Sequence, residues 1–196
     1  MARPHYPHSS VTPIAARPAW VFAYGSLMWD PGFKPEETRP ARLAGWHRAF
    51  CIKSEHYRGT PKVPGLILGL LPGGACRGLA HRLPEGDYDA IRHYLWDREI
   101  LNDGVYFETA RPLTLDDGSI VEALLYLANR EHPSYLGKLP LEEAAALVRQ
   151  GVGVRGRCLD YVANTVSHLD ALGLRESHLH ELLEVASGSA GVPPAS

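Results

Sequence analysis

Two stretches of the sequence carry residues that could do chemistry, and the first is a strand that breaks at a Gly-Ser pair. Residues 20–24 (WVFAY) are apolar and β-prone, and Gly25, Ser26 and Leu27 follow at once. Backbone N–H groups at such a strand end lack ladder partners and can form a nest that binds an anion. Gly25 lets a ligand approach the backbone, and Ser26 adds a hydroxyl that donates or accepts. By itself, the pattern is more typical of an ordinary strand end followed by a turn.

The second stretch is a predicted helix over about residues 87–101, which carries one acid on its apolar face. The stripe is formed by residues at helical spacing, Tyr88, Ile91 and Leu95. At about 100° per residue, the next position on this stripe is Glu99. Asp97 is predicted to point the opposite way, toward solvent, and Arg98 to sit on the flank. One carboxylate is therefore expected to face the interior from the last turn of the helix.

An inward-facing carboxylate such as Glu99 needs a partner or a purpose, because burying it alone costs several kcal/mol. One interpretation is a buried ion pair with an arginine such as Arg58 or Arg77. The other is a general base, with its pKa raised toward the working pH by desolvation and by the negative end of the helix dipole. A nest for an anion together with a base would suit a small zwitterionic substrate.

Other chemistries find little support in the residues. Ser26 is not in a G-x-S-x-G elbow, and no histidine stands out as its base, so a serine hydrolase is a weak alternative. The ten histidines show no metal-ligand spacing, and no C-x-x-C, P-loop or G-x-G-x-x-G is present. We therefore predict no metal and no cofactor.

The elements that must position these residues read as an α+β domain. Strands are expected at 20–24, 43–54, 65–71, 76–83, 105–115 and 120–128, with turns at Pro72–Gly74 and an Asp-Gly hairpin at 116–119. Further helices are expected from Pro140 to Gly151 or Gly153, over about 158–172, and after Ser177. Short strands with tight connections predict a mixed, mainly antiparallel sheet closed into a small barrel, with flanking helices.

Composition sets the class and the compartment. The chain has 196 residues, a net charge of −2 and no basic block, so neither nucleic acid nor a membrane is expected as a partner. Three scattered cysteines and an N-terminus without a signal peptide favour the cytoplasm. We expect one domain over 20–186 between a flexible leader (1–19) and a flexible tail (187–196), as a monomer or weak dimer.

Several segments together resemble a known family, the γ-glutamylcyclotransferases, and specifically their glutathione-specific ChaC branch. The segments are 24–27 (YGSL), 57–61 (YRGTP) with 64–65 (PG), 76–80 (CRGLA), 97–99 (DRE), 132–137 (HPSYLG) and 161–173 (YVANTVSHLDALG). The YGSL motif alone would be a weak match, but with five further ordered segments in register the match is strong. The resemblance covers about residues 20–174.

The resemblance implies a small β-barrel with flanking helices and a lyase that cleaves glutathione to 5-oxoproline and Cys-Gly. It makes Glu99 the catalytic acid–base residue and makes the loop formed by Tyr24, Gly25, Ser26 and Leu27 the site that holds the γ-glutamyl group. Tyr135 matches a family position near the pocket, and we assign Arg58 and Tyr135 to substrate binding.

Three alternatives to the glutathione-specific enzyme remain at this point. One is a cyclotransferase for other γ-glutamyl peptides or amines, because these enzymes share the YGSL loop. Another is a non-catalytic binding module linked to regulation of ion transport, and the third is the Ser26 hydrolase. The sequence also departs from the family at Ala23, where glycine is common, and this residue could narrow the pocket floor.

Overall fold

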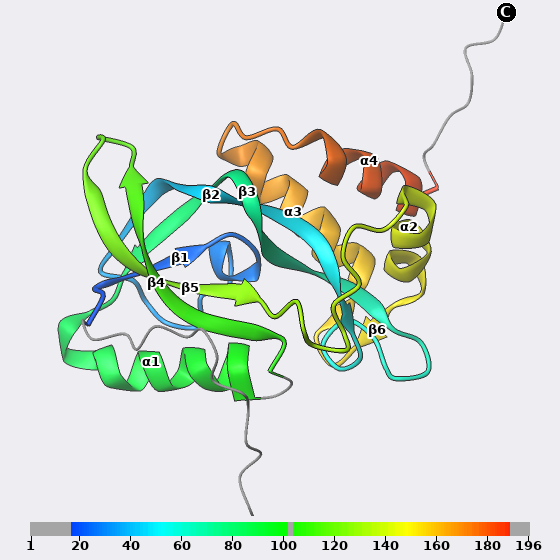
Figure 1. Cartoon of the computed structure of the whole chain (residues 1–196), viewed down its shortest axis with the longest axis horizontal. Helices are drawn as coiled ribbons and strands as arrows, with labels where there is room; N and C mark the ends of the chain where they lie inside the picture. The colour runs from blue at the N-terminus through cyan, green and yellow to red at the C-terminus, as the bar shows by residue number, and fades with distance from the viewer. Residues whose placement is uncertain (1–16, 102–103, 189–196) are drawn as a thin grey trace, which may run out of the picture.

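The computed structural model describes residues 17–101 and 104–188, and its centre is a closed barrel of five strands. Figure 1 shows helix α1 below this barrel, with α2, α3 and α4 grouped at the upper right. The strands are β1 (Trp20–Ala23), β2 (Glu37–Ser54), β3 (Gly65–Arg82), β4 (Tyr106–Leu115), β5 (Ile120–Ala128), β6 (Val152–Gly153) and β7 (Gly156–Arg157). The α-helices are α1 (Tyr88–Trp96), α2 (Leu141–Gln150), α3 (Cys158–Ala171) and α4 (Ser177–Ala186). Short 3₁₀ turns, η1 (Ser26–Met28) and η2 (Glu85–Asp87), and a π-helical turn, η3 (Asp97–Leu101), complete the order.

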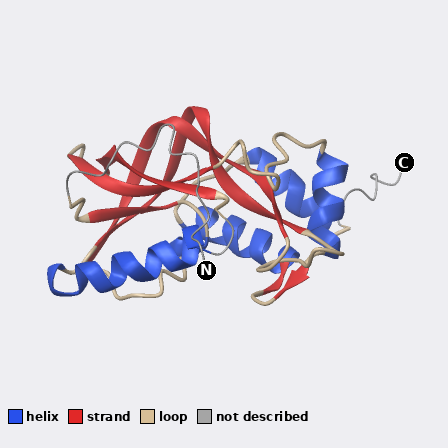
Figure 2. Ribbon diagram, turned by 60° about the horizontal axis from the view of Figure 1, so that its bottom comes forward, coloured by secondary structure: helices blue, strands red, loops and turns tan. Residues whose placement is uncertain are grey.

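The barrel strands lie in the order β1-β3-β2-β4-β5, and β1 closes the barrel against β5. The β1–β5 pair is parallel, whereas every other pair in the barrel is antiparallel. Figure 2 shows the helices outside the barrel and the small β6–β7 hairpin set apart from it. The predicted α+β class and the mainly antiparallel barrel with flanking helices are confirmed.

The prediction of two strands at 65–71 and 76–83 is wrong, because one strand, β3, runs through both. β3 pairs with β2 from Gly65 to Arg82, and the pairing register shifts by one residue between Ala44 and Trp46. Gly73 and Gly74 adopt positive φ beside this irregularity. The glycines therefore form a bulge that bends the long strand and do not form a turn that ends it.

The hairpin between β4 and β5 is confirmed, with Gly118 at positive φ and the Leu115 amide bonded to the Ser119 carbonyl at 2.9 Å. Helices α2, α3 and α4 also lie where the sequence placed them. The helix predicted over 87–101 instead ends at Trp96 and continues as the π-helical turn η3.

The buried core joins the barrel interior to the inner faces of the helices. It includes Phe22 of β1, Leu68 of β3, Leu95 of α1, Leu124 of β5 and Val162 of α3. Among the described residues, no helix has the length and apolar composition needed to cross a membrane. The predicted leader and tail fall mostly in residues 1–16 and 189–196, outside the described part of the chain.

Candidate active site

A cavity of about 490 Å³ opens beside the barrel, where several elements meet. It is lined by Ser26, Trp29, Asp30, Lys53, Ser54, Tyr57, Arg58, Ile67, Tyr94, Arg98, Glu99, Val105, Tyr106, Arg155 and Tyr161. A small inner recess, of about 40 Å³, is lined by Tyr24, Gly25, Ser26, Leu27, Leu68, Glu99, Tyr106, Tyr126 and Tyr161. The cavity and the recess share four residues, which include Ser26 and Glu99. The structure thus brings the loop after β1 and the inward-facing acid to one place.

The loop after β1 lines the recess with Gly25, Ser26 and Leu27. Its carbonyls are used internally, since the Met28 amide bonds the Gly25 carbonyl at 2.9 Å and the Asp30 amide bonds the Ser26 carbonyl at 2.8 Å. Within the described residues, the amides of Gly25, Ser26 and Leu27 donate to no protein acceptor. Backbone amides without a protein acceptor are the kind of group that can bind an anion.

Gly25 is held close to the opposite wall of the recess. A Cβ at this position would lie 3.2 Å from the Tyr161 hydroxyl and 3.5 Å from Leu68. On the far side of the loop, His81 Nε2 bonds the Leu27 carbonyl at 3.0 Å, and Thr38 Oγ1 lies 2.9 Å from His81 Nδ1. Burial lowers the pKa of His81, which favours a neutral ring that donates from Nε2. The loop is thus fixed from behind by a histidine that does not face the cavity.

Glu99 lies in η3, and its carboxylate reaches both the cavity and the recess. Its side chain is 17% exposed, and Arg98 Nε lies 3.1 Å from Oε1. Burial raises the pKa of Glu99, and the charges of Arg98 and Arg155 oppose this rise. A carboxylate with a raised pKa that still opens on a cavity has the properties of a general base.

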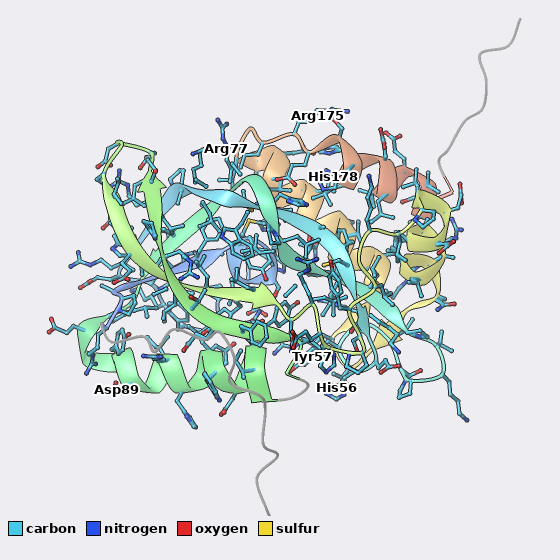
Figure 3. All side chains as sticks on the ribbon, viewed as in Figure 1. His56, Tyr57, Arg77, Asp89, Arg175 and His178 are labelled. Carbon is cyan, nitrogen blue, oxygen red and sulfur yellow. The ribbon has the colours of Figure 1, made fainter. Side chains whose placement is uncertain are left out.

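The partner of Glu99 differs from the arginines that the sequence suggested. Arg98 forms the ion pair. Arg77 lies near the top of the view in Figure 3, far from Tyr57, a residue of the cavity wall, near the bottom. Arg98 is also buried, not on the flank, because a π-helical turn advances each residue by less than the 100° of an α-helix. Two successive residues, Arg98 and Glu99, therefore face the same cavity.

Four tyrosines surround the recess, and the hydroxyls of three of them donate hydrogen bonds to groups other than the Glu99 carboxylate. Tyr24 donates to the Tyr126 carbonyl at 2.7 Å, Tyr106 donates to the Leu68 carbonyl at 2.6 Å, and Tyr126 donates to Glu108 at 3.3 Å. Burial raises the pKa of all four hydroxyls, including that of Tyr161, so they stay neutral. Their rings form much of the wall of the recess around Glu99.

Cationic groups gather at the outer part of the cavity. The Arg58 guanidinium stacks 5.0 Å from the Tyr161 ring centre and donates to the Arg155 carbonyl. Burial lowers the pKa of Arg58, and none of the ion pairs within the described residues includes it. Arg155 stacks over Tyr57 at 5.1 Å and lies 3.7 Å from the Asp30 carboxylate. Arg58 is therefore a partly buried cation that forms an ion pair with no carboxylate in the described part of the chain.

The backbone that carries Arg58 is packed against two glycines. A Cβ on Gly65 would lie 2.1 Å from the Arg58 carbonyl oxygen, and one on Gly151 would lie 2.4 Å from the same atom. The β6–β7 turn packs alongside, with the Arg155 amide bonded to the Tyr57 carbonyl at 3.0 Å. These close contacts hold both arginines at the cavity.

Two of the residues singled out from the sequence do not line the cavity or the recess. Tyr135 pairs with Ile52 and packs in a cluster with Cys51, Val105 and Ala128, so it lies behind the wall that Val105 forms. Ala23 is fully buried in β1 and does not form the pocket floor.

Among the described residues, no histidine lines the two spaces, and the Ser26 hydroxyl accepts from Arg98 at 2.9 Å. A search of the described residues finds no group of histidine, cysteine and acidic side chains that could hold a metal ion.

Several residues of the site were not singled out from the sequence, above all Arg98, Arg155 and Tyr161. Tyr161 carried a signal, because it continues the apolar stripe of α3 with a hydroxyl at the end of its ring. Arg155 carried none, since it lies in a short turn whose position depends on contacts with residues 56–57.

The barrel and the site define a member of a known family: residues 19–188 match the family model described as "ChaC-like protein", and the chain belongs to this family. It is 37% identical over 166 residues to the "Glutathione-specific gamma-glutamylcyclotransferase" of Escherichia coli, covering 85% of this chain and 71% of that protein. It is 30% identical over 170 residues to "Gamma-glutamylcyclotransferase 2-3" of Arabidopsis thaliana, covering 83% of this chain and 85% of the relative.

The fold also matches a solved structure. The yeast γ-glutamyl cyclotransferase specific to glutathione superposes with a TM-score of 0.78, covering 90% of this chain and 98% of the yeast chain. The sequence identity in this comparison is 19%, so the match speaks for the fold alone.

Proposed function

We propose that this protein is a glutathione-specific γ-glutamylcyclotransferase, which cleaves glutathione to 5-oxoproline and Cys-Gly. The observation that carries the proposal is the placement of the Glu99 carboxylate in one recess with the unoccupied amides of Gly25, Ser26 and Leu27. The name of the relative in Escherichia coli supports the same substrate.

In the proposed reaction, Glu99 takes a proton from the α-ammonium group of the substrate. The freed amine attacks the γ-carbonyl carbon of the same molecule, and the bond between this carbon and the cysteine nitrogen then breaks. Glu99 returns this proton to the departing nitrogen. The ring nitrogen, which still carries a positive charge, loses a second proton, and the freed amine of Cys-Gly takes up one proton to become an ammonium group, so the protein ends as it began. Because ring closure is intramolecular, the protein needs mainly to fold the γ-glutamyl arm and to stabilise charge.

The loop amides and the tyrosine rings supply that environment. The amides of Gly25, Ser26 and Leu27 would bind an anionic oxygen of the γ-glutamyl group. The surrounding rings of Tyr24 and Tyr161 exclude water, which strengthens this electrostatic contact. Ser26 acts here as a ligand contact and not as a nucleophile.

Arg58 is the group that we assign to the Cys-Gly half. It is a partly buried cation in the outer cavity and pairs with no described carboxylate, so the glycine carboxylate of glutathione would complete its coordination. This assignment predicts that Arg58→Met raises KM for glutathione more than KM for a γ-glutamyl-alkylamide, which lacks that carboxylate.

The function is tested by measuring 5-oxoproline release from glutathione and from γ-glutamyl-alanine, with wild-type protein and Glu99→Gln. We expect release from glutathione in preference to γ-glutamyl-alanine, and its loss in the variant. Preference for γ-glutamyl-alanine would identify another branch of cyclotransferases. Tight binding of glutathione without turnover would identify a binding module, and labelling of Ser26 by a covalent serine probe would identify a hydrolase.

We also propose that the protein works in the cytoplasm. All three cysteines, Cys51, Cys76 and Cys158, are buried free thiols. This state suits a reducing compartment. Fractionation of cells that express the protein would test the location, and sedimentation analysis would test the expected monomer or weak dimer.

A further inference from the structure

Arg98 is the most highly connected polar side chain at the cavity. It is 8% exposed, and its guanidinium meets four groups. Nη1 donates to the Asp30 carbonyl at 2.7 Å and to the Tyr94 hydroxyl at 2.9 Å, and Nη2 donates to Ser26 Oγ at 2.9 Å. Nε lies 3.1 Å from the Glu99 carboxylate. Three N–H groups of the guanidinium thus donate to protein acceptors, and Nε lies beside the Glu99 carboxylate.

These contacts join segments that are far apart in the sequence. Ser26 and Asp30 bound the loop after β1, and each is about 70 residues from Arg98. The loop is compact between them, because the Asp30 amide bonds the Ser26 carbonyl. One guanidinium therefore ties both ends of the anion-binding loop to the turn that carries Glu99.

The Tyr94 hydroxyl keeps Arg98 in this position. It occupies the space where a side chain on residue 32 would lie, since a Cβ on Gly32 would be 1.9 Å from that oxygen. Gly32 also adopts a φ of +77°, which disfavours other residues. Gly32, just after the loop, and Tyr94 of α1 therefore pack directly against each other beside the Arg98 side chain.

The geometry has two consequences for Glu99. The ion pair with the planar Arg98 fork restrains one carboxylate oxygen, and Arg98 is the one group within the described residues that bonds this carboxylate. The charge of Arg98 also opposes the effect of burial on the pKa of Glu99, ahead of the charge of Arg155. The other titratable groups that line the cavity and the recess are Tyr24, Asp30, Lys53, Tyr57, Arg58, Tyr94, Tyr106, Tyr126 and Tyr161.

We propose that Arg98 is a positioning residue for the reaction at Glu99: its guanidinium holds the base and the anion-binding loop in one fixed relation. This inference rests on the proposed function. Arg98 acts through Glu99 and Ser26 and not by contact with the reacting atoms. Its loss should therefore lower kcat more than it raises KM, whereas the loss of a direct substrate contact would mainly raise KM.

The first experiment compares Arg98→Lys, Arg98→Met and the control Arg92→Met across pH 5.5 to 9 with glutathione as substrate. Arg92 lies on α1, directly before the turn η3, and pairs with Glu108 at 2.7 Å, but it lines neither the cavity nor the recess. We expect kcat to fall by about 10²-fold in Arg98→Met, the scale of a small misplacement of catalytic groups. Arg98→Lys, which keeps the charge and loses the fork, should also lower kcat.

The pH profiles separate charge from geometry. Without the Arg98 charge, the pKa of Glu99 rises further, so the acidic limb of kcat/KM should move to higher pH in Arg98→Met. In Arg98→Lys this limb should stay close to that of wild type. Arg92→Met should leave both the limb and kcat unchanged. A variant of Arg98 with wild-type kcat, or one that raises KM alone, would overturn the proposal.

A second readout does not depend on catalysis. The Glu99 carboxyl is followed by NMR in protein labelled with ¹³C-glutamate and is assigned by the signal lost in Glu99→Gln. We expect its titration midpoint to be higher in Arg98→Met than in wild type, with Arg98→Lys between them. If wild-type protein releases no 5-oxoproline, the proposed function fails while this titration still tests Arg98. Identical midpoints in all three proteins would refute the link between Arg98 and Glu99.

Discussion

Two arginine–glutamate pairs extend from the same helical segment, and only one of them opens on a cavity. Arg98 and Glu99 pair at 3.1 Å in η3, while Arg92 of α1 and Glu108 of β4 pair at 2.7 Å. The Glu108 side chain is 4% exposed and that of Glu99 is 17% exposed. The more deeply buried and more closely paired acid is therefore not the one that we assign to chemistry.

The two carboxylates differ in how far protein partners already occupy their oxygen atoms. Both oxygens of Glu108 are engaged, one by Arg92 and the other by the Tyr126 hydroxyl at 3.3 Å. A carboxylate satisfied in this way supports the fold, and proton transfer would break its contacts. Glu99 has one charged partner and lines both the cavity and the recess. Burial alone does not mark a catalytic acid; burial combined with access to a ligand does.

The largest expected effect comes from replacing each acid by glutamine. Glu99→Gln should lower kcat by about 10³-fold, within the range for a lost general base. Glu108→Gln should retain most of the activity of the folded protein but lower the free energy of unfolding by about 3 kcal/mol. The loss stays at the low end of the usual range, because Arg92 is partly exposed and can recover hydration.

Steady-state kinetics and urea denaturation of both variants measure these two effects. A Glu108→Gln variant that is well folded but inactive would contradict the structural role of Glu108, since Glu108 would then take part in the reaction. A Glu99→Gln variant with near wild-type activity would contradict the catalytic role of Glu99 and remove it from the mechanism.

Local sequence patterns were enough to predict the YGSL loop and the inward direction of Glu99. The loop follows from an apolar strand that ends at glycine, and Glu99 follows from three apolar residues at helical spacing. The β4–β5 hairpin was predicted for the same reason, because an Asp-Gly turn between apolar runs is a local signal.

Features that depend on long-range contacts could not be predicted in this way. The position of Arg98 depends on a π-helical turn, which the 100° periodicity does not describe, and on acceptors about 70 residues away. The continuity of β3 depends on its pairing with β2, which overrides the Pro72–Gly74 turn signal. The place of Tyr135 behind the cavity wall likewise depends on its pairing with Ile52.

The next largest expected effect is on the pH dependence of the free energy of unfolding. Burial raises the pKa of Glu99 above its usual 4.5, so the folded protein keeps this proton at pH values where the unfolded chain has lost it. The stability of wild type relative to Glu99→Gln should therefore fall as the pH rises from 4.5 through the folded pKa. Urea denaturation of both proteins at several pH values measures this difference. A difference that stays constant or grows with pH would contradict the raised pKa.

The smallest expected effects come from two tyrosines of α1, one beside each ion pair. The Tyr94 hydroxyl accepts from Arg98 at 2.9 Å, whereas the buried Tyr88 hydroxyl has no hydrogen-bond partner within the described residues. Tyr94→Phe should lower the free energy of unfolding by about 1 kcal/mol and also reduce kcat, because Arg98 loses an acceptor.

Tyr88→Phe removes a hydroxyl whose burial is not compensated, so it should leave stability unchanged or raise it by up to about 1 kcal/mol. Its kcat should match that of wild type, since Tyr88 lines neither the cavity nor the recess. Thermal denaturation and kinetics of the two variants test both expectations. Equal losses of activity in the two would show that the whole of α1, and not the Arg98 pair alone, controls the position of Glu99.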